Sequence, residues 1–250
     1  MEEFRKVLKM WDEEKYTKEF PESDQKKKLS QPPIQKHYPT EAKLINLIPS
    51  EEITIGDMPF HEVVNKRKSH RKFSDDPLTL EELSFLLWCT QGVKKVTKNR
   101  INRTTPSAGA RHPFETYLII NRVKSLEKGL YRYISIDHKL CFLKSIKNAE
   151  VLIEKLIYKQ YSFVGKGAVV FCWVAIPYRM EWRHSVLSSK FISLEAGHIC
   201  QNLYLACEAI NAGTCGIGFY DQGKIDIFLD IDGEEEFTIY VAPVGKVTNF

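Results

Sequence analysis

Hydrophobic residues recur along the chain in two different periods after about residue 60, which predicts a mixture of helices and strands. Four leucines between residues 80 and 87 recur at three- and four-residue intervals, as on one face of a helix. Thr79 and Glu82 have the spacing of a capping box and mark the start of this helix, which we expect to run through Trp88. The same reasoning predicts further helices at 60–66, 148–158 and 185–210, and strands at 116–121, 130–134, 140–143, 167–176 and 237–244.

Two of these segments are apolar on nearly every side, which predicts that they form the centre of the fold. Residues 167–176 form a continuous apolar run rich in valine, as expected for a strand that is buried on both faces. Residues 185–210 combine helical spacing with apolar residues all round, so we expect a long, central and buried helix.

The first 60 residues differ in composition from the rest of the chain, which predicts a separate role for them. They contain 22 charged residues and six of the eleven prolines, so they cannot form a core of their own. We interpret residues 1–60 as a polar N-terminal arm that packs on a main domain at 61–250. Trp11, Tyr16 and Phe20 are candidate anchors, with a short helix at 4–16, and a partly disordered tail is the other interpretation.

Across the whole chain, hydrophobic residues make up 43% and charged residues 27%, which is ordinary for a globular protein. The formal net charge of +4 is too small to argue for a nucleic-acid partner. The longest apolar run, 168–176, is too short to cross a membrane, and residues 1–15 lack the pattern of a signal peptide. Six cysteines without a C-x-x-C pair predict reduced, mostly buried thiols in a cytoplasmic protein.

A basic segment follows the predicted helix at 60–66 and is the first candidate for ligand binding. Arg67, Lys68 and Arg71 surround Ser69 within five residues. Guanidinium groups bind phosphate through paired hydrogen bonds, and a hydroxyl adds a further donor. The other interpretation is a solvated basic helix end, which the helix dipole favours.

A segment of small residues between two prolines is the second candidate, because its backbone can approach a flat ligand closely. It runs from Pro106 through Ser107, Ala108 and Gly109 to Arg111. Its N–H groups are then free to donate to ring carbonyls or ring nitrogens. An ordinary turn is the other interpretation.

A glycine-rich segment at 213–219 follows the long predicted helix and is the third candidate. It contains Gly216, Ile217 and Gly218, and it lacks both the spacing and the preceding strand of a dinucleotide-binding loop. Its glycines indicate close approach to a ligand, and a helix C-cap is the other interpretation.

The order of these segments along the chain is more specific than any one of them. Arg-x-Ser-x-Arg at 67–71, Pro-Ser-Ala-Gly-Ala-Arg at 106–111, Gly-Ile-Gly at 216–218 and Pro-Val-Gly-Lys at 243–246 together resemble the nitroreductase superfamily. Within it, the chain looks like the SagB-type dehydrogenase branch. The resemblance covers residues 60–246 and includes the stretches at 71–73, 86–88, 90–93, 113–117, 129–133 and 197–203.

The resemblance implies an α+β fold, with a mixed, largely antiparallel sheet flanked by helices, and an intertwined homodimer. It implies that FMN binds at the dimer interface and carries hydride from NAD(P)H to a small-molecule electron acceptor. It assigns the phosphate, ribityl chain and pyrimidine edge of FMN to Arg67, Lys68, Ser69 and Arg71. It assigns the flavin ring to Pro106, Ser107, Ala108, Gly109 and Arg111, and the N5 atom of the ring to the loop of Gly216, Ile217 and Gly218. It assigns a further phosphate contact to Lys246.

Hydride transfer through a flavin needs no side-chain acid or base, so we assign no catalytic residue and keep Arg183 and His184 as candidates. Members of the branch that oxidise azolines in peptide natural products carry a Lys-Tyr pair ahead of the long helix, where this chain reads Trp182-Arg183-His184. His184 is a candidate proton donor, and a solvent-exposed loop histidine is the other interpretation. The alternative functions are therefore an azoline-to-azole dehydrogenase and a flavin-binding module without turnover.

Two Glu-x-x-His pairs, Glu181/His184 and Glu195/His198, resemble half-sites of di-iron proteins. They are too close in sequence to lie on two facing helices, so we expect no metal site. Glu195 and His198 are instead predicted to pair with each other inside the long helix. The basic run at 94–100 is predicted to be a solvated loop, with attraction of an anionic substrate as the alternative.

Overall fold

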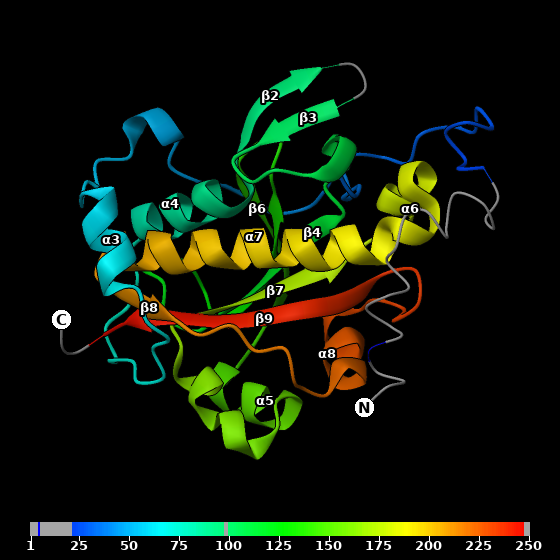
Figure 1. Ribbon diagram of the computed structural model, residues 1–250. Helices are drawn as coiled ribbons and strands as arrows, with labels where there is room; N and C mark the ends of the chain where they lie inside the picture. Colours follow the sequence, from blue (N-terminus) through cyan, green and yellow to red (C-terminus); the bar gives the residue numbers. More distant parts are fainter. Residues whose placement is uncertain (1–4, 6–21, 98–99, 248–250) are drawn as a thin grey trace.

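The computed structural model describes residue 5 and residues 22–97 and 100–247, and its centre is a large antiparallel sheet (Figure 1). The seven strands of this sheet lie in the order β1-β6-β5-β4-β7-β9-β8. Their bounds are β1 (Leu44–Asn46), β4 (Phe114–Ile120), β5 (Gly129–Ile134), β6 (Lys139–Ser145), β7 (Val169–Ala175), β8 (Ala212–Thr214) and β9 (Phe237–Lys246). The predicted α+β fold with an antiparallel sheet flanked by helices is therefore confirmed.

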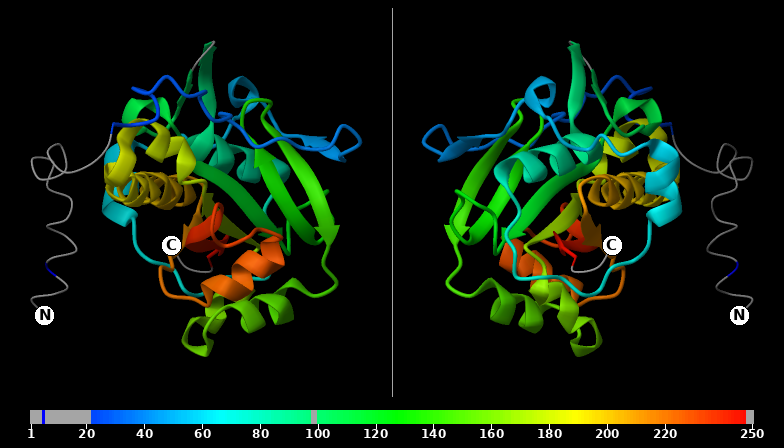
Figure 2. Two further views of the ribbon diagram at one scale, coloured as in Figure 1. Left: turned by 90° about the vertical axis from the view of Figure 1, so that its right-hand side faces the viewer. Right: turned by 90° about the vertical axis from the view of Figure 1, so that its left-hand side faces the viewer.

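Helices cover both faces of the sheet (Figure 2). The helix α7 (Ser188–Ala209) crosses one face together with α4 (Leu80–Gln91), while α5 (Ala149–Leu156) and α8 (Gln222–Leu229) lie on the other. Two hydrophobic clusters fill the two interfaces, one under α4 and α7 and one under α5 and α8. The sheet is thus the middle of three layers, which buries its central strands on both sides.

Strand β7 explains why its sequence is a continuous apolar run. Phe171 and Trp173 belong to the cluster under α7, whereas Val170, Cys172 and Val174 belong to the cluster under α8. Successive side chains of a strand point to opposite faces, so a strand between two layers needs apolar residues at every position. All residues of β7 are buried, as predicted.

The predicted start of α4 is also confirmed. The Thr79 hydroxyl accepts a hydrogen bond from the Glu82 N–H (3.1 Å), and the Thr79 N–H donates to the Glu82 carboxylate (2.9 Å). The reciprocal pair satisfies two donors that would otherwise be orphaned at the helix start. The short helix predicted at 60–66 is α3 (Phe60–Lys66), which lies near one end of α7.

The long helix α7 is less buried than its composition predicts. It begins at Ser188, after a short 3₁₀ turn at Ser185–Leu187. One of its faces is exposed and carries Ser193, Leu194, Gly197, His198 and Gln201. The prediction of a helix buried on all sides was therefore wrong for the single chain.

Several elements lie where the sequence predicted none. The basic run is part of a hairpin of β2 (Val93–Thr97) and β3 (Arg100–Arg103) that projects from the body, not a loop. Helix α6 (Tyr178–His184) precedes α7 and ends at His184, for which an exposed loop was one of the two interpretations. No helix in the described part of the chain has both the length and the apolar character to cross a membrane.

The described part of the first 60 residues lies against the rest of the chain. Strand β1 pairs with β6 at the edge of the sheet. The Gln25 N–H donates to the Trp182 carbonyl (2.8 Å), and the Trp182 indole N–H donates to the Leu29 carbonyl (3.1 Å). The aromatic anchors and nearly all of the helix predicted at 4–16 lie outside the described residues. The boundary between arm and domain stays a prediction.

Candidate functional site

The basic segment and the glycine-rich segment meet at the C-terminal end of α7, and Tyr204 joins them. The Tyr204 hydroxyl lies 3.2 Å from the Ser69 hydroxyl and accepts a hydrogen bond from the Gly216 N–H (2.8 Å). The Arg67 guanidinium lies over the Tyr204 ring, 5.6 Å from its centre. Sequence reasoning missed Tyr204, because an aromatic residue in an apolar helix gives no local signal of a polar contact.

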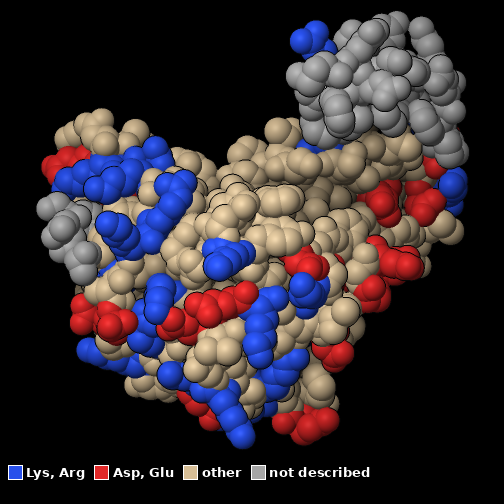
Figure 3. Space-filling model, turned by 90° about the horizontal axis from the view of Figure 1, so that it is seen from below, with Lys and Arg blue, Asp and Glu red and all other residues tan. Residues whose placement is uncertain are grey.

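This end of the molecule carries a concentration of positive charge. Lys66, Lys68, Arg71 and Lys72 are exposed, and Arg67 is partly exposed. Figure 3 shows Lys and Arg side chains gathered on the left side of that view of the molecule. Exposed guanidinium and ammonium groups around a hydroxyl form a surface that favours a phosphate group.

The glycine-rich segment offers fewer free N–H groups than its sequence implies. The Ile217 N–H donates to the Val241 carbonyl (2.7 Å), and the Gly216 N–H is used by Tyr204. Gly218 is exposed, and a Cβ atom placed on it would meet no atom within 4 Å. Of these three residues, Gly218 is the one that leaves open space for a ligand beside its backbone.

Lys246, predicted as a phosphate contact, makes an ion pair within the chain. Its ammonium group contacts the Glu82 carboxylate, which also caps α4. The Lys246 carbonyl accepts a hydrogen bond from the Ser74 N–H (2.8 Å). Lys246 therefore lies near the basic segment, with its charge already balanced by a carboxylate.

The segment of small residues lies at the other end of α7, where Glu195 holds it. Pro106 and Gly109 are exposed, and the Ala108 N–H donates to the Glu195 carboxylate (2.8 Å). Burial raises the pKa of Glu195 to about 7. The Ser107 hydroxyl accepts from the His112 N–H (2.8 Å), which closes the turn. The segment is therefore fixed by its own backbone and by one carboxylate of α7.

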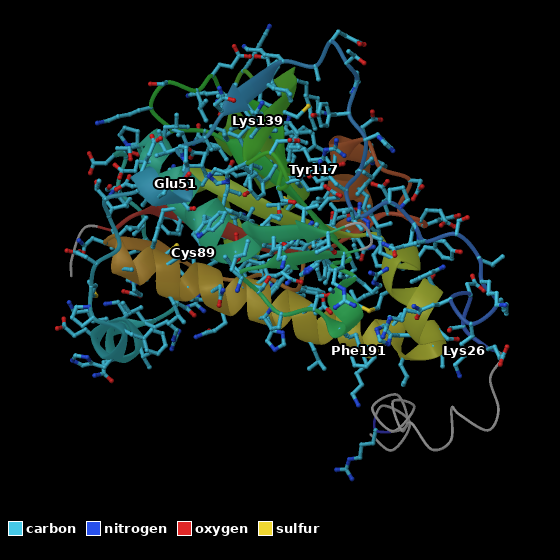
Figure 4. The ribbon with its side chains drawn as sticks, turned by 90° about the horizontal axis from the view of Figure 1, so that it is seen from above. Lys26, Glu51, Cys89, Tyr117, Lys139 and Phe191 are labelled. Atoms are coloured by element: carbon cyan, nitrogen blue, oxygen red, sulfur yellow. The ribbon has the colours of Figure 1, made fainter. Side chains whose placement is uncertain are left out.

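The two catalytic candidates on α6, Arg183 and His184, contact this segment. Gly109 has a φ of 61°, and a Cβ atom on it would lie 2.5 Å from the Arg183 Nε and 3.2 Å from the His184 Nε2. The His184 ring packs on Phe191, with 4.8 Å between ring centres. Phe191 lies at the first turn of α7 in Figure 4. Burial lowers the pKa of His184, which favours its neutral form. The histidine is half-buried at the end of a helix and is not a free loop residue.

Arg111 lies in the same region but is buried by other groups. Its guanidinium lies 5.3 Å from the centre of the Trp182 ring, and its Nε donates to the Gly109 carbonyl (3.1 Å). The arginine thus braces the turn at Gly109.

The predicted pairing of Glu195 with His198 was wrong. Glu195 points to Ala108, whereas His198 lies on the exposed face of α7. Within the described part of the chain, no three His, Cys, Asp or Glu side chains are grouped closely enough to hold a metal ion.

The two groups of candidate residues are separated along α7. Glu208 contacts the basic segment and Glu195 contacts the small-residue segment. These residues are thirteen positions apart, which corresponds to about 20 Å along a helix. The structure therefore brings together 67–71 with 213–218, and 106–111 with 183–184, but it does not bring the two groups together in one chain.

Comparisons with known proteins agree in the family that they indicate. The sequence model of the protein family described as "Nitroreductase family" matches residues 64–246 of this chain. A protein of Methanocaldococcus jannaschii described as a nitroreductase is 31% identical over 193 residues, which cover 77% of this chain and 93% of that protein. A crystal structure of a protein described as a nitroreductase from Ralstonia eutropha has a TM-score of 0.70 at 25% identity and covers 89% of this chain and all of that one. A chain of the Escherichia coli microcin synthetase McbBCD complex shares the fold, with a TM-score of 0.61 at 17% identity over 85% of this chain and 77% of that one.

Proposed function

Because this chain belongs to the nitroreductase family, we propose that it is an oxidoreductase that uses bound FMN to move hydride from NAD(P)H to a small-molecule acceptor. When bound, FMN supplies the redox chemistry, and the chain supplies binding, orientation and charge. We place this activity in the cytoplasm, where the six cysteines, all free and five of them buried, would stay reduced.

The observation that carries the proposal is the exposed cationic segment at 67–71, which Tyr204 joins to the glycine-rich segment. Arg67, Lys68 and Arg71 would bind the phosphate of FMN, and Ser69 would donate a further hydrogen bond. Gly218 would let the flavin approach the backbone, because its position has no side chain and no close neighbour. These residues fit a flat ligand that ends in a phosphate. Lys246 would contact the phosphate by exchanging its ion pair with Glu82 for one with the ligand.

We assign the ring of FMN to the segment from Pro106 to Gly109, braced by Arg111. This segment lies at the far end of α7, which favours a site that is shared by two copies of the chain. In a two-fold dimer whose α7 helices run antiparallel, the basic segment of one copy (residues 67–71, the basic loop) would meet the small-residue segment of its partner. The exposed face of α7, with Leu194 and Gly197, would then become buried.

A second candidate is an azoline-to-azole dehydrogenase of the SagB-type branch. The observation that favours it is the contact of Arg183 and His184 with Gly109, which would bring a cation and a neutral imidazole to the flavin-lining segment. The imidazole would accept a proton from the azoline ring, and the hydride lost from the same ring would pass to the bound FMN as the oxidant. The fold likeness to a chain of microcin synthetase is compatible with this candidate.

The test is flavin binding and reduction by the purified chain, with a matched pair of variants. We expect the wild type to bind FMN and to lose the oxidised flavin absorbance under anaerobic addition of NADH or NADPH. Arg67→Ala/Arg71→Ala should weaken FMN binding by about tenfold or more, because charge-assisted hydrogen bonds to phosphate are lost. Lys94→Ala/Lys95→Ala removes two exposed charges from the hairpin and should leave the affinity unchanged.

Three outcomes separate the candidates. A wild type that takes up no FMN contradicts all three functions. Binding without reduction by NADH, NADPH or an azoline peptide indicates a flavin-binding module. Oxidation of an azoline peptide coupled to reduction of the bound FMN favours the second candidate, and an acceptor screen after reduction by NAD(P)H tests the first.

A further inference from the structure

One residue of the basic loop points inward while its neighbours face solvent. His70 is 8% exposed, whereas Ser69 and Arg71 on either side of it are exposed. The His70 Nε2 lies 2.9 Å from the Glu208 Oε1, and the His70 N–H donates to the Thr214 carbonyl (2.9 Å). The histidine therefore fixes the middle of the loop to α7 through its ring and to the sheet through its backbone.

Glu208 holds the loop at a second point. The same Oε1 atom accepts a hydrogen bond from the Lys68 N–H (3.1 Å), so one carboxylate oxygen is bound to two residues of the loop. Glu208 is only 1% exposed, and within the described residues its Oε2 atom has no hydrogen-bond partner. Burial of a carboxylate with one oxygen unsatisfied is costly.

Helix stability does not explain this carboxylate. Glu208 lies in the last turn of α7, where the helix dipole disfavours negative charge. Its contacts to Lys68 and His70 are the features that account for its position.

The His70 side chain of the loop also packs closely against strand β8 of the sheet. A Cβ atom on Gly213 would lie 2.5 Å from the His70 Cγ and 2.6 Å from the His70 Cβ. The imidazole is therefore packed directly on the backbone of β8, between this strand and the end of α7. Because Gly213 is the residue that allows this packing, an added methyl group there would displace the ring.

We propose that Glu208 and His70 are positioning residues that hold the loop so that Arg67, Ser69 and Arg71 face the phosphate of the bound flavin. This inference rests on the proposed function. It explains how the chain would prefer FMN to riboflavin, because the two flavins differ by the phosphate that the loop would bind. Glu208 and His70 act through the loop and contact no ligand. Their loss should therefore affect the phosphate end of the flavin and leave the contribution of the ring unchanged.

The experiment measures the affinities of FMN and riboflavin for each variant, together with thermal unfolding. Glu208→Ala removes both hydrogen bonds and should weaken FMN binding by about tenfold while riboflavin affinity stays the same. Glu208→Gln keeps an acceptor oxygen for the Lys68 N–H and should retain most of the preference for FMN. If Glu208→Ala does not fold, Gly213→Ala tests the same point by displacing the His70 ring.

Asp226→Ala is the matched control, because Asp226 is also a buried helical carboxylate with one oxygen bound to two groups. Its Oδ1 accepts from the Thr238 N–H (2.9 Å) and from the Thr238 hydroxyl (2.6 Å). This variant should lower stability and leave the ratio of FMN to riboflavin affinity unchanged. An unchanged ratio in folded Glu208→Ala or Gly213→Ala overturns the inference alone. A wild type that binds neither flavin overturns the proposed function as well.

Discussion

Two buried carboxylates on one helix hold the two segments that we assign to the flavin. Glu195 accepts the Ala108 N–H, and Glu208 accepts the Lys68 N–H. The sequence marked Glu195 as half of a Glu-x-x-His pair and did not mark Glu208, because the segments that these carboxylates contact lie 87 and 140 residues away along the chain. Each carboxylate supplies a hydrogen-bond acceptor for a backbone N–H group of its loop. Because a buried N–H group without an acceptor is costly, these polar side chains are tolerated inside an apolar helix.

Glu195 should make stability depend on pH. Its pKa in the folded state, about 7, is above the ordinary value of 4.5, so the folded state holds the proton more tightly than the unfolded state. The resulting stabilisation is complete below the ordinary value and is lost as the pH rises toward 7. Glu195→Gln cannot ionise, so from about pH 5 to about pH 8 it should gain about 2 kcal/mol of unfolding free energy relative to the wild type.

Urea unfolding at both pH values measures this difference. Glu154→Gln, on the exposed side of α5, is the control and should follow the wild type at each pH. An equal pH dependence of wild type and Glu195→Gln would rule out Glu195 as the titrating group.

Local signals predicted the helices and strands that build the two cores. The leucine spacing and the capping box located α4, and the run of apolar residues located β7. The hairpin of β2 and β3 was missed because its lysines and arginines suggest a solvated loop, although the two strands pair antiparallel, with one irregularity between Val93 and Lys95. The pairing of these strands depends on contacts between the two strands and not on the strand propensity of the residues in either one.

Thr79→Ala should test how much the capping box contributes to the start of α4. The variant loses the hydroxyl that accepts the Glu82 N–H, and Glu82 is also the ion-pair partner of Lys246. We expect a loss of about 1 kcal/mol in the free energy of unfolding, measured with urea. Thr97→Ala in the exposed hairpin should change it by less than about 0.5 kcal/mol. Equal effects of the two variants would contradict a specific role for the cap.

For the molecule as a whole, the exposed face of α7 is the main feature that a single chain leaves unexplained. The helix has the composition of a buried element, yet Leu194 is 50% exposed. Its two ends carry the two halves of the proposed flavin site. An assembly of two copies would bury this face of α7 and would also bring the two halves of the proposed flavin site together.

Leu194→Glu should therefore weaken both self-association and FMN binding. A carboxylate at this position would lose its hydration when the face is buried between two copies, which opposes association. Sedimentation equilibrium and FMN titration measure the two effects, and we expect each to fall by about tenfold or more. Val151→Glu is the control, because Val151 is similarly exposed (45%) but lies on α5, on the other face of the sheet. A wild type that binds FMN as a monomer would contradict the shared site.

The sequence by itself determined the features that depend on neighbours along the chain. Periodicity and capping located α4 and β7, and the order of the basic, small-residue and glycine-rich segments indicated the family. Only the tertiary structure decided which of these groups are still available for a ligand. The Ile217 N–H is used by Val241, and Lys246 is paired with Glu82, 164 residues away. Such pairings form between segments that meet only on folding, so no local pattern of residues encodes them.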